Sequence, residues 1–259
     1  MKRVKTAVIL AAGMGTRLYD VTNDLIPKGF LELNGKTLIE RSIEKLRSIG
    51  IEKIYIVTGH LNEFYDELSK KYNFIETRRN RRYRTTGSMT SLSVLEKELD
   101  EDFLLLESDI VYEVYGLIKT AAFDNDDCVL LSGRTNSGDE CYVEVKDNNL
   151  YKISKDKNEI NEVYGELVGI SKISLDLYKD MIKAYRNFID EEKFSTENDN
   201  GDIKVTAKYD YENAIFDAAQ NRKVGYLKIN DLMWGEIDNK EQLERVREIV
   251  LPKLESMNV

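Results

Sequence analysis

A single stretch near the amino terminus constrains the fold of this chain more than any other. Residues 7–10 read Ala-Val-Ile-Leu, and the length and β-branching of this run predict a buried strand. Two alanines follow, and then Gly13 and Gly15, in a loop whose free amides can surround an anion. Arg17 and Lys28 add two positive charges beside that loop. The stretch therefore predicts a binding site for a nucleoside triphosphate.

Short apolar runs alternate with amphipathic stretches through the rest of the first half. The apolar runs predict buried strands, and the amphipathic stretches predict helices. This alternation is typical of an α/β fold with a mostly parallel sheet, in which ligands bind at the carboxyl ends of the strands. Two polar turns fall at such ends, the glycine loop and Glu107-Ser108-Asp109. The expected helices cover 37–48, 61–72 and 87–99, and the expected strands cover 54–57, 74–75 and 103–106.

The second half of the chain predicts strands of mixed direction inserted into this fold. Two apolar runs flank Asp147-Asn148-Asn149, which is typical of a hairpin turn. The acidic, polar stretch 191–202 is expected to be a surface loop. The chain shows no internal repeat, and it is expected to form one domain over 1–259. The other expected strands cover 128–132, 167–173 and 224–229, and the other expected helices cover 175–188, 211–219 and 238–249.

Composition narrows the function classes. The formal net charge of −9 disfavours nonspecific binding to nucleic acid, and no run of about 18 apolar residues predicts a membrane span. Cys128 and Cys141 do not form a CxxC pair, and they are expected to be free thiols in a reducing cytoplasm. With His60 as its one histidine, the chain has no His/Cys zinc pattern. Any metal must then be held by carboxylates, which favours Mg²⁺.

At this point the motifs resemble a known family. The pattern Ala-Ala-Gly-Met-Gly-Thr-Arg over 11–17, followed by Ile-Pro-Lys over 26–28, is similar to the signature of nucleotidyltransferases that activate small phosphorylated compounds. Sugar-1-phosphate nucleotidyltransferases and bacterial phosphocholine cytidylyltransferases share it. Three later features agree in order: Gly87-Ser88, Asp109 after a predicted strand, and Trp-Gly-Glu-Ile-Asp over 234–238. A glycine loop alone would be a weak signal, whereas this ordered set is specific.

The resemblance implies a three-layer, Rossmann-like nucleotidyltransferase fold with a mostly parallel central mixed sheet and inserted acceptor-binding strands. Residues 1–125 would mainly bind nucleotide, 126–235 would mainly bind the acceptor, and 236–259 would add a metal ligand and the terminal helix. Arg17 and Lys28 would be the catalytic residues: Arg17 would hold the β- and γ-phosphates, and Lys28 would reach the α-phosphate or the attacking oxygen. Asp109 and Asp238 would hold Mg²⁺, with Glu107 and Glu236 in supporting or structural roles. The donor nucleotide would contact Leu10, Ala11, Ala12, Gly13, Gly15, Thr16, Arg17, Gly87 and Ser88, the last two at the start of a helix that faces the base.

The acceptor is the harder question. A quaternary ammonium needs aromatic faces, whereas a primary ammonium needs carboxylates and carbonyls. The stretch 132–140 contains two acids and no aromatic residue. Residues 26–30, 135–139 and 165–171 together most resemble 2-aminoethylphosphonate cytidylyltransferases, which implies CTP as the donor and a role in phosphonate biosynthesis. The expected acceptor-binding residues are Ser132, Asp139, Lys155, Glu166, Asp210 and Tyr211.

Several alternatives stay open. Phosphocholine is the alternative acceptor to 2-aminoethylphosphonate, because Tyr209 and Tyr211 could face a methylated amine. A sugar-1-phosphate nucleotidyltransferase would prefer UTP or dTTP. A regulatory subunit that binds nucleotide without turnover is the alternative outside the enzymes. The arginine-rich run 78–84 could draw in nucleotide, bind RNA or be a solvated loop. A homodimer is compatible with this family, and the chain could be one domain of a longer fusion.

Overall fold

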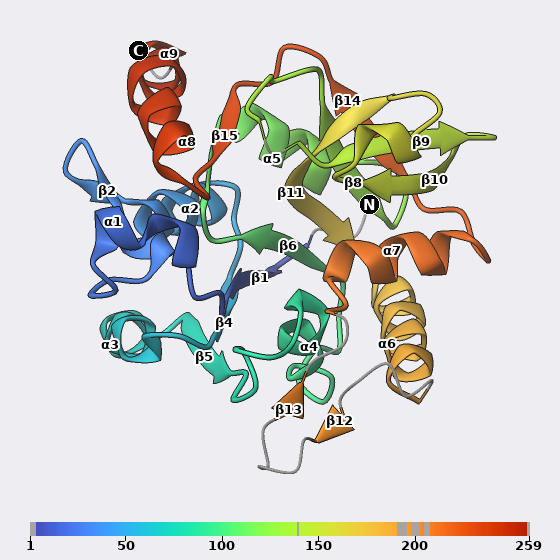
Figure 1. Ribbon diagram of the computed structural model, residues 1–259, viewed down its shortest axis with the longest axis horizontal. Coiled ribbons are helices and arrows are strands. Elements are labelled where there is room, and N and C mark those ends of the chain that lie inside the picture. The colour runs from blue at the N-terminus through green and yellow to red at the C-terminus, as the bar shows by residue number, and fades with distance from the viewer. Residues whose placement is uncertain (1–3, 139, 191–195, 198–202, 205–207, 258–259) are drawn as a thin grey trace.

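The computed structural model describes residues 4–138, 140–190, 196–197, 203–204 and 208–257. A mixed sheet in the order β10-β9-β11-β6-β1-β4-β5 runs through its middle; β8 also pairs with β11, and β14 pairs with β8 (Figure 1). This sheet contains strands from both halves of the sequence. Its strands are β1 (Thr6–Ala11), β4 (Lys53–Thr58), β5 (Ile75–Arg79), β6 (Phe103–Glu107), β8 (Cys128–Ser132), β9 (Tyr142–Lys146), β10 (Asn149–Ser154), β11 (Gly165–Ile173) and β14 (Tyr226–Ile229).

Strand direction divides the sheet as the sequence predicts. The strands β6, β1, β4 and β5 are parallel, and helices connect them along the chain. From β11 onward the pairing changes, because β11 runs antiparallel to β6, β8 and β9. The predicted hairpin is β9–β10, where Asp147 and Asn148 adopt positive φ angles of 52° and 55°. Asx residues tolerate this left-handed backbone, so the turn chemistry explains the hairpin.

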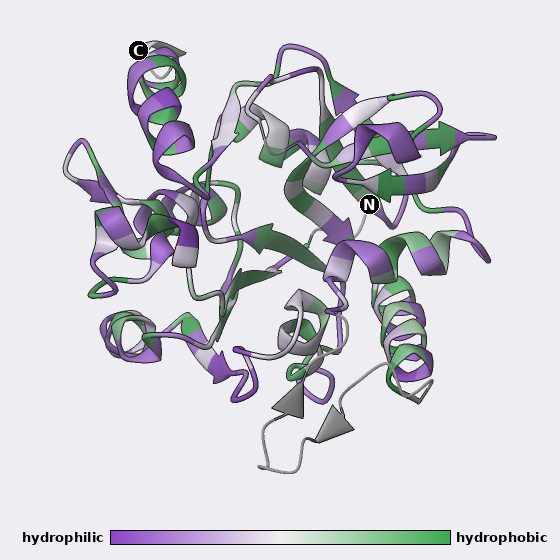
Figure 2. Cartoon of the chain, in the orientation of Figure 1, coloured by the Kyte–Doolittle hydropathy of each residue, from purple (hydrophilic) through white to green (hydrophobic). Residues whose placement is uncertain are grey.

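Alternation along β1 explains the three layers. Ala7 and Ile9 point to one face, where they pack with α2, α3 and α5, while Val8 and Leu10 point to the other, where they pack with α4, α6 and α7. Figure 2 shows β1 and β6 as hydrophobic strands between helices that are striped with polar residues. The bounds of these helices are α2 (Leu38–Ser48), α3 (Asn62–Lys71), α4 (Ser88–Ser93), α5 (Val114–Ala121), α6 (Leu175–Asp190) and α7 (Tyr211–Ala219).

A smaller hydrophobic core lies beside the sheet, and the C-terminal helices pack in it. A ribbon of β7 (Ile110–Tyr112) and β15 (Trp234–Glu236) pairs antiparallel, and Ile110 lies opposite Glu236. After it the chain forms α8 (Lys240–Arg245), the π-helical turn η4 (Val246–Val250) and α9 (Leu251–Met257). The remaining elements are short: η1 (Thr16–Leu18), α1 (Tyr19–Thr22), η2 (Lys28–Phe30), β2 (Glu32–Leu33), β3 (Lys36–Thr37), η3 (Lys157–Glu159), β12 (Thr196–Glu197) and β13 (Ile203–Lys204).

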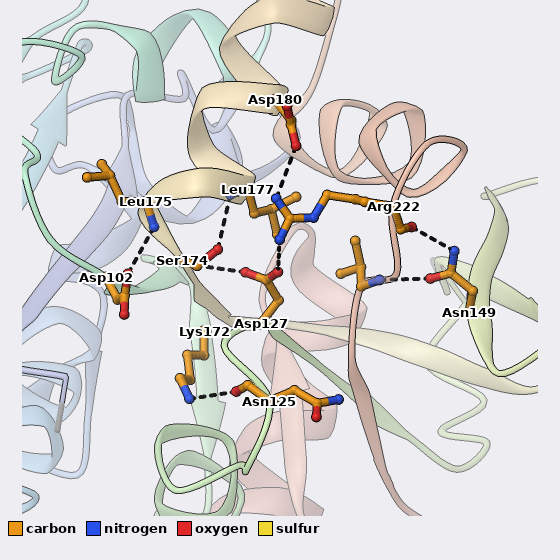
Figure 3. Close-up of polar contacts among 11 residues, drawn as sticks. Asp102, Asn125, Asp127, Asn149, Lys172, Ser174, Leu175, Leu177, Asp180 and Arg222 are labelled. Carbon is orange, nitrogen blue, oxygen red and sulfur yellow. Dashed lines mark hydrogen bonds and ion pairs between the residues drawn. The ribbon is translucent and has the colours of Figure 1, made fainter. Parts of the chain in front are cut away.

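Polar contacts join the second half to the sheet (Figure 3). The buried carboxylate of Asp127 accepts a hydrogen bond from the Ser174 amide at 2.8 Å and pairs with the Arg222 guanidinium at 2.9 Å. Arg222 also reaches Asp180 on α6 at 3.0 Å. Nearby, the buried amine of Lys172 donates to the carbonyl of Asn125 at 2.8 Å. These contacts fix the start of α6 against the segment that leads into β14.

The sequence was less accurate about element ends. Helix α2 starts as predicted, because Thr37 and Glu40 form a capping box. In contrast, α4 stops at Ser93, six residues before the predicted end, since the next amides bond to carbonyls only three residues back. Strand β5 extends to Arg79, well beyond the predicted end at residue 75. The predicted surface loop 191–202 lies outside the described residues, except for β12.

None of the helices in the described part of the chain has the length and apolar character that crossing a bilayer requires. Within the same part, Cys128 and Cys141 are both free thiols. Burial raises the pKa of each thiol, so both groups are protonated at neutral pH.

Candidate active site

A cavity of about 430 Å³ opens at the carboxyl ends of β1 and β6, as the sequence predicts. Four parts of the chain that are far apart in sequence form most of its walls, and single residues such as Lys155 and Glu236 complete them. The glycine loop and Lys28 form one side, the start of α4 a second, the end of β6 a third, and the start of α7 the fourth. Its lining includes Leu10, Ala11, Ala12, Gly13, Gly15, Thr16, Lys28, Gly87, Ser88, Glu107, Asp109, Lys155, Asp210, Tyr211, Glu212 and Glu236.

The glycine loop is shaped around Lys28. Gly15 has a φ of 63°, a left-handed conformation that glycine adopts without strain, and a Cβ there would lie 2.9 Å from Cγ of Lys28. A Cβ on Gly13 would meet nothing within 4 Å, so this part of the loop faces open space. Gly15 thus lets the Lys28 side chain pass close to the loop backbone, and Gly13 leaves room for a ligand beside that backbone.

Lys28 lies between the two carboxylates that the sequence singled out as metal ligands. Its amine is 3.0 Å from Oδ2 of Asp109 and also pairs with Oδ1 of Asp238, and Arg17 pairs with the other oxygen of Asp238. Burial opposes the charges of these groups, but the ion pairs outweigh it. They raise the pKa of Lys28 and hold the pKa of Asp238 well below its usual range. The predicted cations and the predicted metal ligands are therefore one network.

The same corner offers a carboxylate set that suits a divalent cation. Asp109, Glu236 and Asp238 each present an oxygen, and the three oxygens lie within 4.8 Å of one another. Oxygen donors of this kind fit Mg²⁺. The ribbon β7–β15 creates the group, because Asp109 precedes one strand while Glu236 ends the other. Sequence reasoning gave Glu236 only a supporting role, although both predicted metal ligands, Asp109 and Asp238, stand two residues after a glutamate, and this shared spacing was the available signal.

Two more carboxylates line the cavity, Glu107 and Glu212, and sequence reasoning did not assign them to the acceptor. The Tyr211 hydroxyl donates to Oε1 of Glu107 at 2.8 Å. Among the described residues, the buried Oε2 of Glu212 has no hydrogen-bond partner. Burial, and then the charges of neighbouring carboxylates, raise the pKa of Glu107 and of Glu212. A cationic ligand group would stabilise their ionised forms. Lys155, a predicted acceptor residue, lines the same cavity.

The starts of α4 and α7 are hydrogen-bonded to each other. Oδ1 of Asp210 accepts the Ser88 amide at 2.7 Å and the Ser88 hydroxyl at 2.9 Å, and Oγ of Ser88 accepts the Tyr211 amide at 2.9 Å. A Cβ on Gly87 would lie 2.3 Å from the Tyr209 carbonyl oxygen, which explains the glycine. The Ser88 amide, expected to face the base, is therefore engaged by Asp210. Asp210 lines the cavity, and its hydrogen bonds cap α4.

Two predicted acceptor residues lie outside the lining of this cavity. Ser132 is buried and donates to the carbonyl of Gly133. Glu166 accepts hydrogen bonds from the amide and hydroxyl of Thr135 at 2.9 and 2.6 Å. Both order the loop after β8. Asp139, the third predicted residue of this region, lies outside the described residues.

Comparison with known proteins agrees with this geometry. Residues 7–141 match the family model described as "MobA-like NTP transferase domain". The chain is 28% identical over 256 residues to CTP:phosphoglutamine cytidylyltransferase of Campylobacter jejuni, which covers 92% of this chain and 97% of that protein.

Shorter matches cover less than half of each protein. A choline-phosphate cytidylyltransferase of Streptococcus pneumoniae is 38% identical over 38% of this chain and 42% of its own length. A 2-aminoethylphosphonate cytidylyltransferase of Lancefieldella rimae is 31% identical over 40% of this chain and 43% of its own length. Among solved structures, the inositol-1-phosphate CTP transferase of T. maritima has a TM-score of 0.77 at 20% identity, over 98% of this chain and 97% of that chain, which shows the same fold.

Proposed function

The chain belongs to the MobA-like NTP transferase family and is a nucleotidyltransferase, and we propose that it transfers a cytidylyl group from CTP to 2-aminoethylphosphonate. One observation carries the proposal: the glycine loop, Lys28, Asp109 and Glu236 line one cavity, and Glu107 and Glu212 line it too. We place the triphosphate beside the glycine loop and a cationic acceptor group beside Glu107 and Glu212, which we call the acidic end of the cavity. The CTP-using relatives support the choice of base.

The reaction needs alignment and charge stabilisation more than proton transfer. An oxygen of the acceptor, already an anion at neutral pH, attacks the α-phosphorus of CTP in line, and the bond from the α-phosphorus to the bridging oxygen breaks as pyrophosphate leaves. Amides of the glycine loop and Arg17 would bind the β- and γ-phosphates, and Lys28 would stabilise the negative charge that develops at the α-phosphate. Asp109, Glu236 and Asp238 would hold Mg²⁺, which supplies further charge stabilisation when bound.

The acidic end of the cavity favours a primary ammonium on the acceptor. Its three N–H donors could be satisfied by Glu107 and Glu212, whose oxygens include a buried one without a partner among the described residues. A quaternary ammonium has no N–H to donate, and it gains most from aromatic faces. Here the hydroxyl of Tyr211 is directed at Glu107. Lys155 could pair with the phosphonate group of the same acceptor.

A pyrophosphate-release assay tests the proposal. CTP, UTP, dTTP and ATP are each combined with Mg²⁺ and with 2-aminoethylphosphonate, phosphocholine, phosphoglutamine or glucose-1-phosphate. We expect rapid release only with CTP and 2-aminoethylphosphonate. Higher turnover with another acceptor would overturn the acceptor while leaving cytidylyl transfer intact. A preference for UTP or dTTP with the sugar phosphate would overturn both.

Two variants test the acceptor end separately. Glu212→Gln removes a carboxylate from the cavity and should raise the KM for 2-aminoethylphosphonate at least tenfold, with the KM for CTP changed less than twofold. Glu166→Gln is the matched control, because Glu166 lies outside the cavity lining and bonds to Thr135. An equal rise of the acceptor KM in both variants would contradict the role of Glu212.

We also propose a cytoplasmic location, where the thiols of Cys128 and Cys141 would stay reduced.

A further inference from the structure

Exposed arginines gather on the turn between β5 and α4, and three of them, Arg79, Arg81 and Arg82, do not line the cavity described above. Arg79, Arg81 and Arg82 are exposed, and none has an ion-pair partner among the residues that the structure describes. Arg78 differs from them, because its guanidinium bonds to Glu76 and Glu98, each at 2.8 Å. Arg78 is therefore structural, whereas the charges of the next three arginines point to solvent.

A buried asparagine holds this turn in place. Asn80 is 3% exposed, and its amide donates to the Thr58 carbonyl at 2.8 Å. Its side-chain oxygen accepts the Arg82 amide at 2.9 Å, and its side-chain nitrogen donates to Thr86 and Ser91 at 3.1 and 3.0 Å. The exposed arginines are thus mounted on a fixed backbone, not on a free loop.

The turn leads directly to the mouth of the cavity. Arg84 and the side chain before it, Tyr83, line the cavity, and Arg84 donates to the Tyr83 hydroxyl at 3.1 Å. Gly87 and the start of α4 follow at once. The charges of Arg79, Arg81 and Arg82 therefore lie next to the entrance without lining it.

The negative charge of the rest of the molecule makes these three positive charges important for attracting an anionic ligand. The chain carries a formal net charge of −9, and the cavity is lined by five carboxylates against four cationic side chains. A nucleoside triphosphate carries about four negative charges without a metal, so neither the whole molecule nor the cavity attracts it strongly from a distance. Clustered charges near a cleft can raise association rates about 10- to 1,000-fold.

We propose that Arg79, Arg81 and Arg82 steer a nucleoside triphosphate electrostatically into the cavity and so raise its association rate. We call these three arginines the collector. The collector acts before contact, on the triphosphate and not on the base. It rests on the proposed function only in taking a nucleotide as the ligand of this cavity. It predicts an effect on the association rate that weakens as salt screens the charges.

The test compares two triple variants with the same net charge of −12, three units below the −9 of the parent chain. Arg79→Gln/Arg81→Gln/Arg82→Gln removes the collector charges. The control variant removes three exposed lysines that do not line the cavity, as Lys97→Gln/Lys157→Gln/Lys253→Gln. Stopped-flow fluorescence measures the association and dissociation rates of a fluorescent CTP analogue at ionic strengths of about 20 and 500 mM. Circular dichroism checks that both variants keep the parent's unfolding temperature.

At low ionic strength we expect association to slow about fivefold in the collector variant and less than twofold in the control. At high ionic strength, where the screening length is about 4 Å, both variants should match the parent. Dissociation should stay within twofold throughout, and fluorescent ATP should show the same loss as the CTP analogue. Equal slowing in the two variants would overturn the proposal, as would a loss confined to dissociation or one that persists at high salt.

Three further outcomes separate this inference from a role in RNA binding and from the proposed function. Tight binding of a short single-stranded RNA that disappears only in the collector variant would assign the arginines to RNA and overturn the proposal. Slower nucleotide capture without cytidylyl transfer in the parent would refute the proposed function and leave the collector standing. Unchanged capture in an active enzyme would do the reverse.

Discussion

Replacing Lys28 by methionine tests the network at the centre of the site. The change keeps an unbranched side chain that is one atom shorter, and it removes the cation that lies between Asp109 and Asp238. At 3.0 Å and an effective dielectric constant of about 20, the amine and the Asp109 carboxylate attract each other by about 5 kcal/mol before desolvation is counted. Removing one partner of a buried ion pair costs about 3–5 kcal/mol in measured cases. Asp238 is 4% exposed, so water cannot replace the lost partner.

We expect Lys28→Met to lower the free energy of unfolding by about 3 kcal/mol at pH 7, and the unfolding temperature by about 6 to 12 °C. The deficit should depend on pH in a definite direction. In the parent, ion pairing holds the pKa of Asp238 below its unfolded value, so this stabilisation is present above about pH 4 and lost in acid. Without Lys28 the crowded carboxylates should take up protons more readily, so the deficit should shrink from pH 8 to pH 5.

Calorimetry with and without Mg²⁺ provides the assay. Three carboxylates without their ammonium should bind Mg²⁺ more tightly, so 10 mM Mg²⁺ should raise the unfolding temperature of Lys28→Met more than that of the parent. Lys172→Met is the matched control. It also loses a buried amine, but that amine bonds to the carbonyls of Phe123 and Asn125 and not to carboxylates. A response of Lys28→Met to Mg²⁺ no larger than that of Lys172→Met would refute the reasoning.

Three other substitutions test separate parts of the structure. The amine of Lys45 lies 4.5 Å from the ring centre of Tyr112, and burial lowers its pKa to about 8. The free energy of unfolding should therefore rise with pH between about 8 and 10.5. In chemical denaturation, Lys45→Met should abolish that rise and keep or increase the free energy of unfolding at pH 7. Arg222→Met should cost about 3 kcal/mol in urea unfolding, because it leaves the buried Asp127 carboxylate without its cation, while KM values measured below the new midpoint stay unchanged. Asp210→Ala should cost about 1 kcal/mol as a lost helix cap and raise the KM for both substrates, whereas a rise for the acceptor alone would show that Asp210 binds it directly.

The sequence predicted the parts of the fold that local pattern encodes. The buried run before the glycine loop, the capping box at Thr37 and the turn at Asp147 each have a signal within a few residues, and the structure confirms all three. It did not predict the ribbon β7–β15, because strands of three residues are too short to show periodicity. The grouping of Glu236 with Asp109 depends on that ribbon, so the sequence alone could not show it.

The acceptor end was hardest to predict for the same physical reason. The hydrogen bonds between Ser88 and Asp210 join residues 122 positions apart, and no local pattern announces them. Glu212 enters the cavity only because α7 packs against α4 through those bonds. Ser132 and Glu166 were predicted to bind the acceptor from their positions at a strand end and a strand start; in the structure they lie outside the cavity lining and form hydrogen bonds with the loop after β8.

The most direct test of the central claim is to identify the product. Purified protein is incubated with CTP, Mg²⁺ and 2-aminoethylphosphonate, and the mixture is followed by phosphorus NMR. The account predicts that a phosphonate joined to a phosphate through a bridging oxygen appears in equal amount to pyrophosphate, and that both form about tenfold more slowly with Glu212→Gln when the acceptor concentration is below the KM of the parent. CTP consumption without this linked product, or faster formation of the corresponding product from phosphocholine, would contradict it.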